Sequence, residues 1–122
     1  MPNEQKTVIL LASDLMMISS VGGAAAANGL KFQSCSTASA ATEACAGAEN
    51  VLMLIDLGTP GLDVRELADA LPPTVVTHAV AYGPHVHTTK LQAARDAGIG
   101  TVLSRGQFSM QAGQIVGAFA DR

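Results

Sequence analysis

An unbroken apolar run that ends in a single acid is the feature that most constrains this chain. Residues 51–63 read VLMLIDLGTPGLD, so five apolar residues precede Asp56 and a turn rich in glycine and proline follows it. A short apolar run bounded by turn signals is typical of a strand that is buried on both faces. In an open α/β sheet, ligand sites form where such strands end. Asp56 is therefore the first candidate functional residue, with an ordinary turn residue as the alternative interpretation.

Segments with strand character alternate with segments of helix character along the whole chain. The sequence predicts strands over residues 7–12, 30–35, 51–56, 75–81 and 101–103, and helices over residues 15–28, 38–46, 62–71, 88–97 and 107–120. Such an alternation pairs the strands in parallel through right-handed crossovers, and five units are too few to close a barrel. We therefore expect an α/β fold, a doubly wound (βα)5 three-layer sandwich with the flavodoxin-like strand order 2-1-3-4-5.

Local signals set the expected boundaries of these elements. Ser13 and Asp14 are suited to cap the first helix. Residues 30–35 alternate apolar and polar side chains, as an edge strand does. The prolines at 72–73 are expected to end the helix before them, which leaves the β-branched segment 75–81 as the fourth strand.

Composition excludes several classes of function. The chain has 122 residues and a net charge of −3, with no cluster of Lys and Arg, so we expect no nucleic-acid binding. Cys35 and Cys45 form neither a zinc pattern nor a disulfide framework and are predicted to be free, buried thiols. No secretory signal is visible, and no apolar run approaches the roughly 20 residues of a membrane helix. We expect a cytoplasmic protein of one domain, residues 1–122, with a polar segment at 1–6.

No motif indicates an enzyme. Residues 58–61 and 98–100 contain paired glycines without the sequel of a phosphate-binding loop, and a Gly-x-Ser-x-Gly nucleophile turn is missing. His85 and His87 lie two residues apart after the predicted fourth strand, which is a weak metal-site signal. A rigid Gly-Pro turn is the simpler interpretation of that loop.

Two segments resemble the receiver domains of bacterial two-component response regulators. Receivers typically end their third strand with an apolar run, an Asp and a Pro-Gly turn, as residues 51–63 do. Residues 93–105 (AARDAGIGTVLSR) resemble the fourth helix, the Ala-Gly turn and the fifth strand of a receiver. The resemblance extends over nearly the whole chain by the order and spacing of the elements. It implies that Asp56 is the aspartate that accepts a phosphoryl group.

The acids of the receiver site are only partly present. Receivers usually carry two adjacent acids after the first strand that help to hold Mg²⁺, whereas this chain has Ser13 and Asp14. Mg²⁺ commonly takes one or two carboxylates together with waters. Asp14 and Asp56 are therefore a weak Mg²⁺ candidate site.

The groups that contact the phosphoryl group in receivers are also changed. The Ser or Thr at the end of the fourth strand matches Ala81, with Tyr82 beside it as a further candidate contact. The fifth-strand Lys, which pairs with the phosphoacceptor, matches Arg105, a planar cation that does not replace Lys neutrally. Gly106 follows where receivers usually have Pro.

These departures favour a pseudo-receiver: a stand-alone, receiver-like signalling domain with a degenerate phosphoacceptor site. Such a domain would act by protein-protein contact, with a partner or a second copy of itself, commonly through the face made by strand four, helix four and strand five. The alternative is a functional response regulator that is phosphorylated on Asp56 with Mg²⁺. A small-ligand or metal-sensing flavodoxin-like module is a further alternative.

Overall fold

Strands and helices alternate from Lys6 to the end of the chain. The computed structural model describes residues 5–122, so the polar segment predicted at 1–6 lies mostly outside the described residues. The strands are β1 (Lys6–Leu11), β2 (Lys31–Cys35), β3 (Asn50–Asp56), β4 (Val80–Gly83) and β5 (Thr101–Ser104). The helices are α1 (Leu15–Ala27), α2 (Ala38–Ala46), α3 (Val64–Ala70), α4 (Pro73–His78), α5 (Thr88–Asp96) and α6 (Arg105–Asp121).

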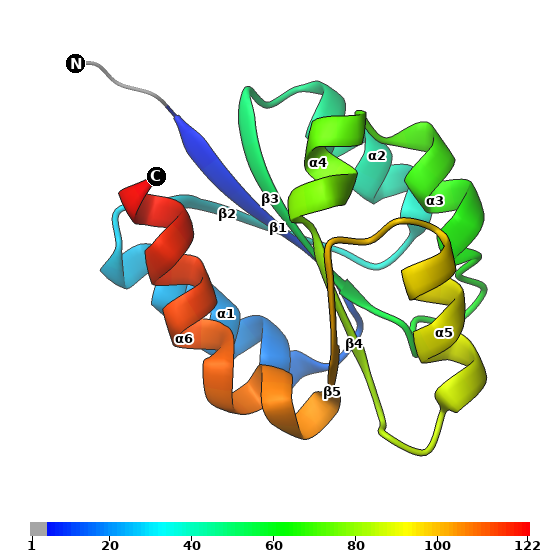
Figure 1. Ribbon diagram of the computed structural model, residues 1–122. Helices are drawn as coiled ribbons and strands as arrows, with labels where there is room; N and C mark the ends of the chain where they lie inside the picture. The colour runs from blue at the N-terminus through cyan, green and yellow to red at the C-terminus, as the bar shows by residue number, and fades with distance from the viewer. Residues whose placement is uncertain (1–4) are drawn as a thin grey trace.

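The strands form one parallel sheet in the order β2-β1-β3-β4-β5. This order confirms the predicted doubly wound α/β fold. Figure 1 shows α1 and α6 on one face of the sheet and α2, α3, α4 and α5 on the other. β1 and β3 are neighbours at the point where the strand order reverses, so their carboxyl ends flank the usual position of a ligand site in such folds.

Two apolar layers attach the helices to the sheet. Side chains alternate between the two faces of a strand. Leu52 and Leu54 of β3 pack with α1 and α6 in one layer, here called the α1/α6 layer. Met53 and Ile55 pack with α2, α3 and α5 in the other, the α2/α3/α5 layer. Both faces of β3 are therefore covered, as its unbroken apolar run predicts.

The predicted fourth strand is wrong over its first residues. Residues 75–78 belong to α4, and β4 begins only at Val80. The two prolines predict a helix end, but Pro73 occupies the first turn of a new helix, where its missing N–H and its fixed φ are tolerated. Burial of Val76 in the α2/α3/α5 layer outweighs the weak helix propensity of β-branched residues. His78, predicted inside the strand, is the exposed last residue of α4.

The last helix starts earlier than predicted, at Arg105. The Ser104 hydroxyl accepts a hydrogen bond of 3.1 Å from the Gln107 amide, and the Gln107 side chain accepts one of 2.9 Å from the Ser104 amide. This reciprocal capping box fixes the helix start. Arg105 therefore lies on the first turn of α6 and not at the end of β5.

The two cysteines are free and buried, which confirms that prediction. Burial raises the pKa of both the Cys35 and the Cys45 thiol. Among the helices of residues 5–122, none combines the length and the apolar character that a membrane span requires.

Candidate functional site

Asp56 is the last residue of β3 and lies at the carboxyl edge of the sheet. It is 7 % exposed, and its Oδ1 accepts a hydrogen bond of 2.8 Å from the Gly58 amide. The Thr59 hydroxyl and amide donate to the Asp56 carbonyl oxygen, at 2.7 and 3.0 Å. These bonds tie the following turn to the strand end and hold the carboxylate in a defined orientation.

Asp14 reaches the same edge of the sheet from the loop after β1. It is the N-cap of α1, and its Oδ1 accepts hydrogen bonds from the Met16 and Met17 amides, at 2.9 and 3.3 Å. A carboxylate at this position satisfies free amides and interacts favourably with the helix dipole. Of the two caps that the sequence offers, Asp14 therefore performs the role and Ser13 does not.

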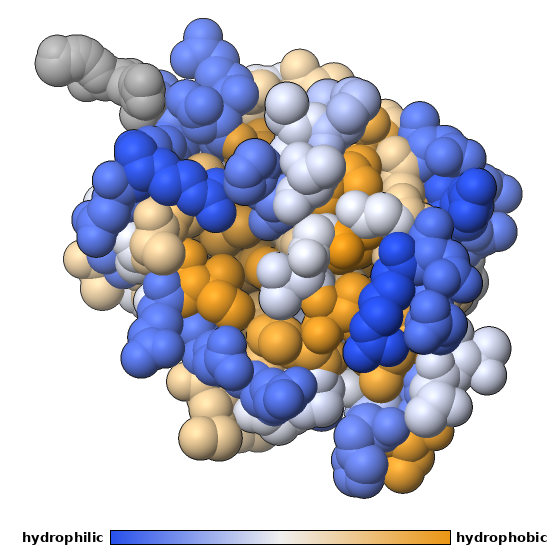
Figure 2. All heavy atoms as spheres, in the orientation of Figure 1, coloured by the Kyte–Doolittle hydropathy of each residue, from blue (hydrophilic) through white to orange (hydrophobic). Residues whose placement is uncertain are grey.

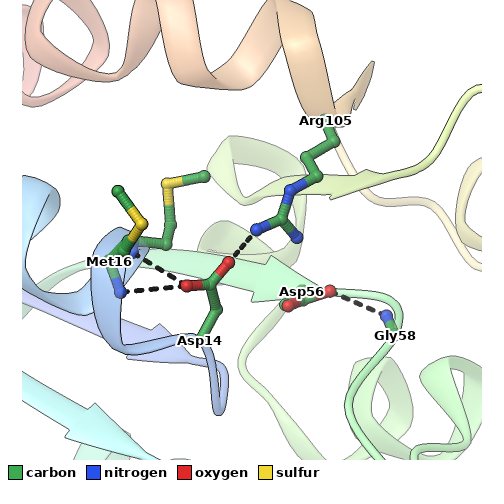
Figure 3. A network of polar contacts seen from close by, with 6 residues as sticks. Asp14, Met16, Asp56, Gly58 and Arg105 are labelled. Atoms are coloured by element: carbon green, nitrogen blue, oxygen red, sulfur yellow. Dashed lines mark hydrogen bonds and ion pairs between the residues drawn. The ribbon is translucent and has the colours of Figure 1, made fainter.

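Arg105 forms an ion pair with Asp14 beside Asp56 (Figure 3). Its Nη2 contacts Oδ2 of Asp14, and the two side chains are 45 % and 22 % exposed, respectively. The resemblance to receivers implied a cation paired with the phosphoacceptor, whereas this ion pair is with the acid that caps α1. Figure 3 shows that the Asp56 carboxylate is not part of this ion pair and is directed toward Gly58. Segments far apart in the sequence thus bring Asp14 and Arg105 together at the edge of the sheet where β3 ends with Asp56.

Of the two candidate contacts on β4, the structure brings Tyr82 to the side of Asp56. The register pairs Ala81 with Ile55 and Tyr82 with Asp56. Ala81 packs in the α2/α3/α5 layer, whereas Tyr82 packs in the α1/α6 layer. Asp56 follows Leu54 at the strand period of two, which places its side chain on the Tyr82 side as well.

Tyr82 fills this side of the sheet with an aromatic ring. The residue is fully buried, and its ring stacks on Phe108 of α6 with a centroid separation of 4.2 Å and an interplanar angle of 4°. Within the described part of the chain, its buried hydroxyl has no hydrogen-bond partner. Burial, and to a smaller extent the negative charge of Asp56, raise the pKa of Tyr82 far above its ordinary value. The side chain is therefore a neutral phenol enclosed in the α1/α6 layer.

The acids of the site fit Mg²⁺ poorly. Mg²⁺ requires nearly octahedral oxygen ligands and holds its waters tightly. Both oxygens of Asp14 already have partners, Oδ1 in the two amides and Oδ2 in Arg105. Oδ1 of Asp56 is bound to Gly58. Residues 5–122 contain no group of three or more His, Cys, Asp or Glu side chains placed to hold a metal ion.

The two loop histidines lie on the turn that leads from β4 into α5. His85 and His87 are exposed, and neither belongs to a cluster of three metal-binding side chains within residues 5–122. The His87 amide donates to the Pro84 carbonyl oxygen at 2.9 Å, so residues 84–87 form a tight turn from β4 into α5.

Comparison with known proteins rests on structure alone. No protein-family model matches the sequence, and no curated protein is similar to it. The response regulator receiver domain from Rhodospirillum rubrum superposes with a TM-score of 0.70 at 16 % identity, over 95 % of this chain and 94 % of that one. A protein from Chloroflexus aurantiacus that is assigned as a response regulator gives a TM-score of 0.75 at 14 % identity, over 98 % and 100 %. The chain has a receiver-domain fold.

A third similar structure is the receiver domain of the Saccharomyces cerevisiae response regulator Ssk1, solved together with the histidine phosphotransfer protein Ypd1. Its TM-score is 0.66 at 14 % identity, over 84 % of this chain and 79 % of that one. These superpositions show the receiver fold. At identities this low, the chemistry of the site has to be argued from the residues of this chain.

Two residues that shape the candidate site were not predicted from the sequence. Ser104 starts α6 and so sets the position of Arg105, and the Ser-x-x-Gln pattern from Ser104 to Gln107 is a signal that predicts this start. Phe108 covers Tyr82, but that contact depends on the packing of α6 against β4, which no local pattern encodes.

Proposed function

We propose that this chain is a receiver-like signalling module, not an enzyme, with a degenerate phosphoacceptor site, and that it acts by binding a protein partner. The observation that carries this proposal is that both carboxylate oxygens of Asp14 already have partners. Oδ1 accepts hydrogen bonds from two α1 amides, and Oδ2 forms the ion pair with Arg105. Phosphoryl transfer depends on cations that neutralise the charge developing on the phosphoryl oxygens. Here Arg105, the cation at this edge of the sheet, already forms an ion pair with Asp14.

The environment of Tyr82 supports the same proposal. A receiver uses a small hydroxyl side chain at the end of strand four to contact the phosphoryl group. In this chain the residue paired with Asp56 is Tyr82, whose hydroxyl is enclosed in the α1/α6 layer. Among the described residues, that hydroxyl makes no hydrogen bond to Asp56 or to any other group. We therefore propose that the domain keeps one state irrespective of phosphoryl donors.

The face along β5 is the surface that we propose for partner binding. In Figure 2, apolar side chains gather in the middle of the face on which β5 lies, between polar ridges on either side. Val102 and Leu103 of β5 are only half-buried. An apolar centre inside a polar rim is the usual composition of a protein-protein interface.

Similar structures illustrate two kinds of partner. The Ssk1 receiver domain was solved with a phosphotransfer protein, and the beryllofluoride-activated NtrC4 receiver domain was solved as a dimer. For this chain we propose a cytoplasmic signalling protein as the partner, with a second copy of the chain as the alternative.

Intact mass spectrometry tests the state of Asp56 directly. Wild type and Asp56→Asn are incubated with acetyl phosphate, each with and without Mg²⁺. We expect no gain of a phosphoryl group in either protein. A Mg²⁺-dependent phosphoryl adduct on wild type that is lost in Asp56→Asn would contradict the proposal.

One observation favours a second candidate, a working phosphoacceptor. Asp56 is retained at the end of β3, and its turn is closed by hydrogen bonds that orient the carboxylate. That candidate requires Mg²⁺ to displace Arg105 from Asp14. The same mass measurement distinguishes the two.

A further inference from the structure

Arg105 occupies a position where a helix tolerates a cation least. The N-terminal end of a helix carries a positive partial charge, so basic residues are unfavourable in its first turn. Arg105 is the first residue of α6, and Ser104 and Gln107 already cap that end without it. The stability of α6 itself therefore does not explain why an arginine occupies its first position. Its side chain is instead directed to the N-cap of α1.

Asp14 is a preorganised partner for that guanidinium. Its Oδ1 is fixed by two amides, which leaves Oδ2 for Arg105. The carboxylate is 22 % exposed, so it is shielded more than an ordinary surface acid. An acid already held in place loses little freedom when it forms an ion pair, in contrast to two mobile surface chains.

The fixed charges at this edge of the sheet nearly balance without a metal. Asp14 and Asp56 bring two negative charges, and Arg105 brings one positive charge. α1 and α6 both begin here, and each helix start contributes roughly +0.5 of an elementary charge. A divalent cation would give this edge an excess of positive charge.

We infer that Arg105 is the resident cation of the site, which takes the place of Mg²⁺ at Asp14 and joins the starts of α1 and α6 beside Asp56. The inference rests on the proposed function, and it identifies the ion pair between Arg105 and Asp14 as the contact that holds the degenerate site in one state. It predicts that Asp14 and Asp56 bind a divalent ion more tightly once Arg105 is removed.

Magnesium titrations of single and double variants test this inference. The amide ¹H–¹⁵N spectra of wild type, Arg105→Gln and Arg105→Gln/Asp14→Asn are recorded with rising Mg²⁺, and Mn²⁺ broadening locates the ion. Arg95→Gln is the matched control, because Arg95 is an exposed arginine on α5 with no ion pair within residues 5–122. Each spectrum also reports whether the variant is folded.

We expect Arg105→Gln to bind Mg²⁺ at Asp14 and Asp56 at least about tenfold more tightly than wild type, because a repelling unit charge has been removed. The double variant and Arg95→Gln should behave as wild type does. Equal affinity of wild type and Arg105→Gln, or binding away from these acids, would overturn the inference.

A second measurement keeps the inference testable if Arg105→Gln does not fold. In Asp14→Asn, the Arg105 side-chain Nε–H signal should shift and broaden relative to wild type, because a guanidinium without its ion pair exchanges its protons with water faster. An unchanged signal would contradict the resident-cation role. Phosphorylation of wild type in the mass experiment would contradict the proposed function, whereas a failure of Arg105→Gln to gain Mg²⁺ affinity would contradict only this inference.

Discussion

Gly100 is a position at which this fold leaves no room for a side chain. A Cβ atom on Gly100 would lie 2.7 Å from the Thr77 carbonyl carbon and would overlap the carbonyl oxygen. The obstacle is the backbone of α4, which cannot rotate away as a side chain can. At the same junction, the Gly100 amide donates to the Val76 carbonyl oxygen and the Thr101 amide to that of Ala79, both at 3.1 Å.

We expect Gly100→Ala to lower the free energy of unfolding by about 3–5 kcal/mol. A methyl group fits only if β5 moves away from α4, which breaks two hydrogen bonds of about 1 kcal/mol each. A buried donor or acceptor left without a partner costs a further ~1–3 kcal/mol. This loss is about a fifth or more of the roughly 5–15 kcal/mol that stabilises an ordinary domain.

Urea unfolding followed by far-UV circular dichroism measures this loss. Gly23→Ala is the matched control, because Gly23 lies inside α1 and a Cβ there would meet nothing within 4 Å. It should stabilise the protein by about 0.5–1 kcal/mol, since alanine is the better helix former. A Gly100→Ala protein within about 1 kcal/mol of wild type would refute the reasoning.

Three further predictions concern buried or clamped side chains. Tyr82→Phe should leave stability unchanged or raise it by up to about 1 kcal/mol in urea unfolding, because it removes a buried hydroxyl without a partner among the described residues; a clear destabilisation would reveal a hydrogen bond to that hydroxyl. Burial raises the pKa of Cys35, Cys45 and Tyr82 in the folded protein. Their contribution to the free energy of unfolding is therefore fully present below pH 9.0, the pKa of an unfolded thiol, and is lost as the pH rises through the higher pKa values of the folded state. Stability measured against pH should therefore fall above pH 9 and less so in Tyr82→Phe, and a level profile would speak against the burial effect. Lys6→Met should destabilise by about 1 kcal/mol in thermal or urea unfolding, because the Lys6 ammonium donates to three carbonyl oxygens at the end of α6; an unchanged midpoint would make those contacts energetically neutral.

Elements with their own local signals were predictable from the sequence. α2 spans Ala38–Ala46 as predicted, because Thr37 caps its start and Gly47 follows its end. The run before Asp56 predicted a strand covered on both faces, and β3 is such a strand. In these segments, local propensity and tertiary burial favour the same structure.

The segment from residue 73 to 78 was not predictable in this way. Its β-branched residues favour a strand locally, and its two prolines are compatible with either a helix end or a helix start. The helix forms because Val76 is buried and because the carbonyl oxygens of Val76 and Ala79, at the end of α4, accept the amides of Gly100 and Thr101. Those partners lie more than twenty residues away and carry no local signature.

The candidate site likewise has features that the sequence predicts and features that it does not. Asp14 and Asp56 follow β1 and β3, which are neighbours in the sheet as the predicted strand order requires, so the sequence was sufficient to place both residues at the same edge of the sheet. The partner of Arg105 depends on where α6 begins, and the side chain that faces Asp56 depends on where β4 begins. Both boundaries lay within a few residues of the predicted ones, but a shift of one residue moves a strand side chain to the opposite face.

The amide ¹H–¹⁵N spectrum of the wild-type protein with Mg²⁺ and beryllofluoride, a stable mimic of a phosphoryl group on an aspartate, tests the proposed single state most directly. If Arg105 holds the site and Tyr82 stays enclosed, the spectrum is unchanged from that of the free protein. Saturable shifts that start at Asp56 and extend along β4, α5 and β5, and that are lost in Asp56→Asn, would show a responsive receiver and contradict the degenerate site.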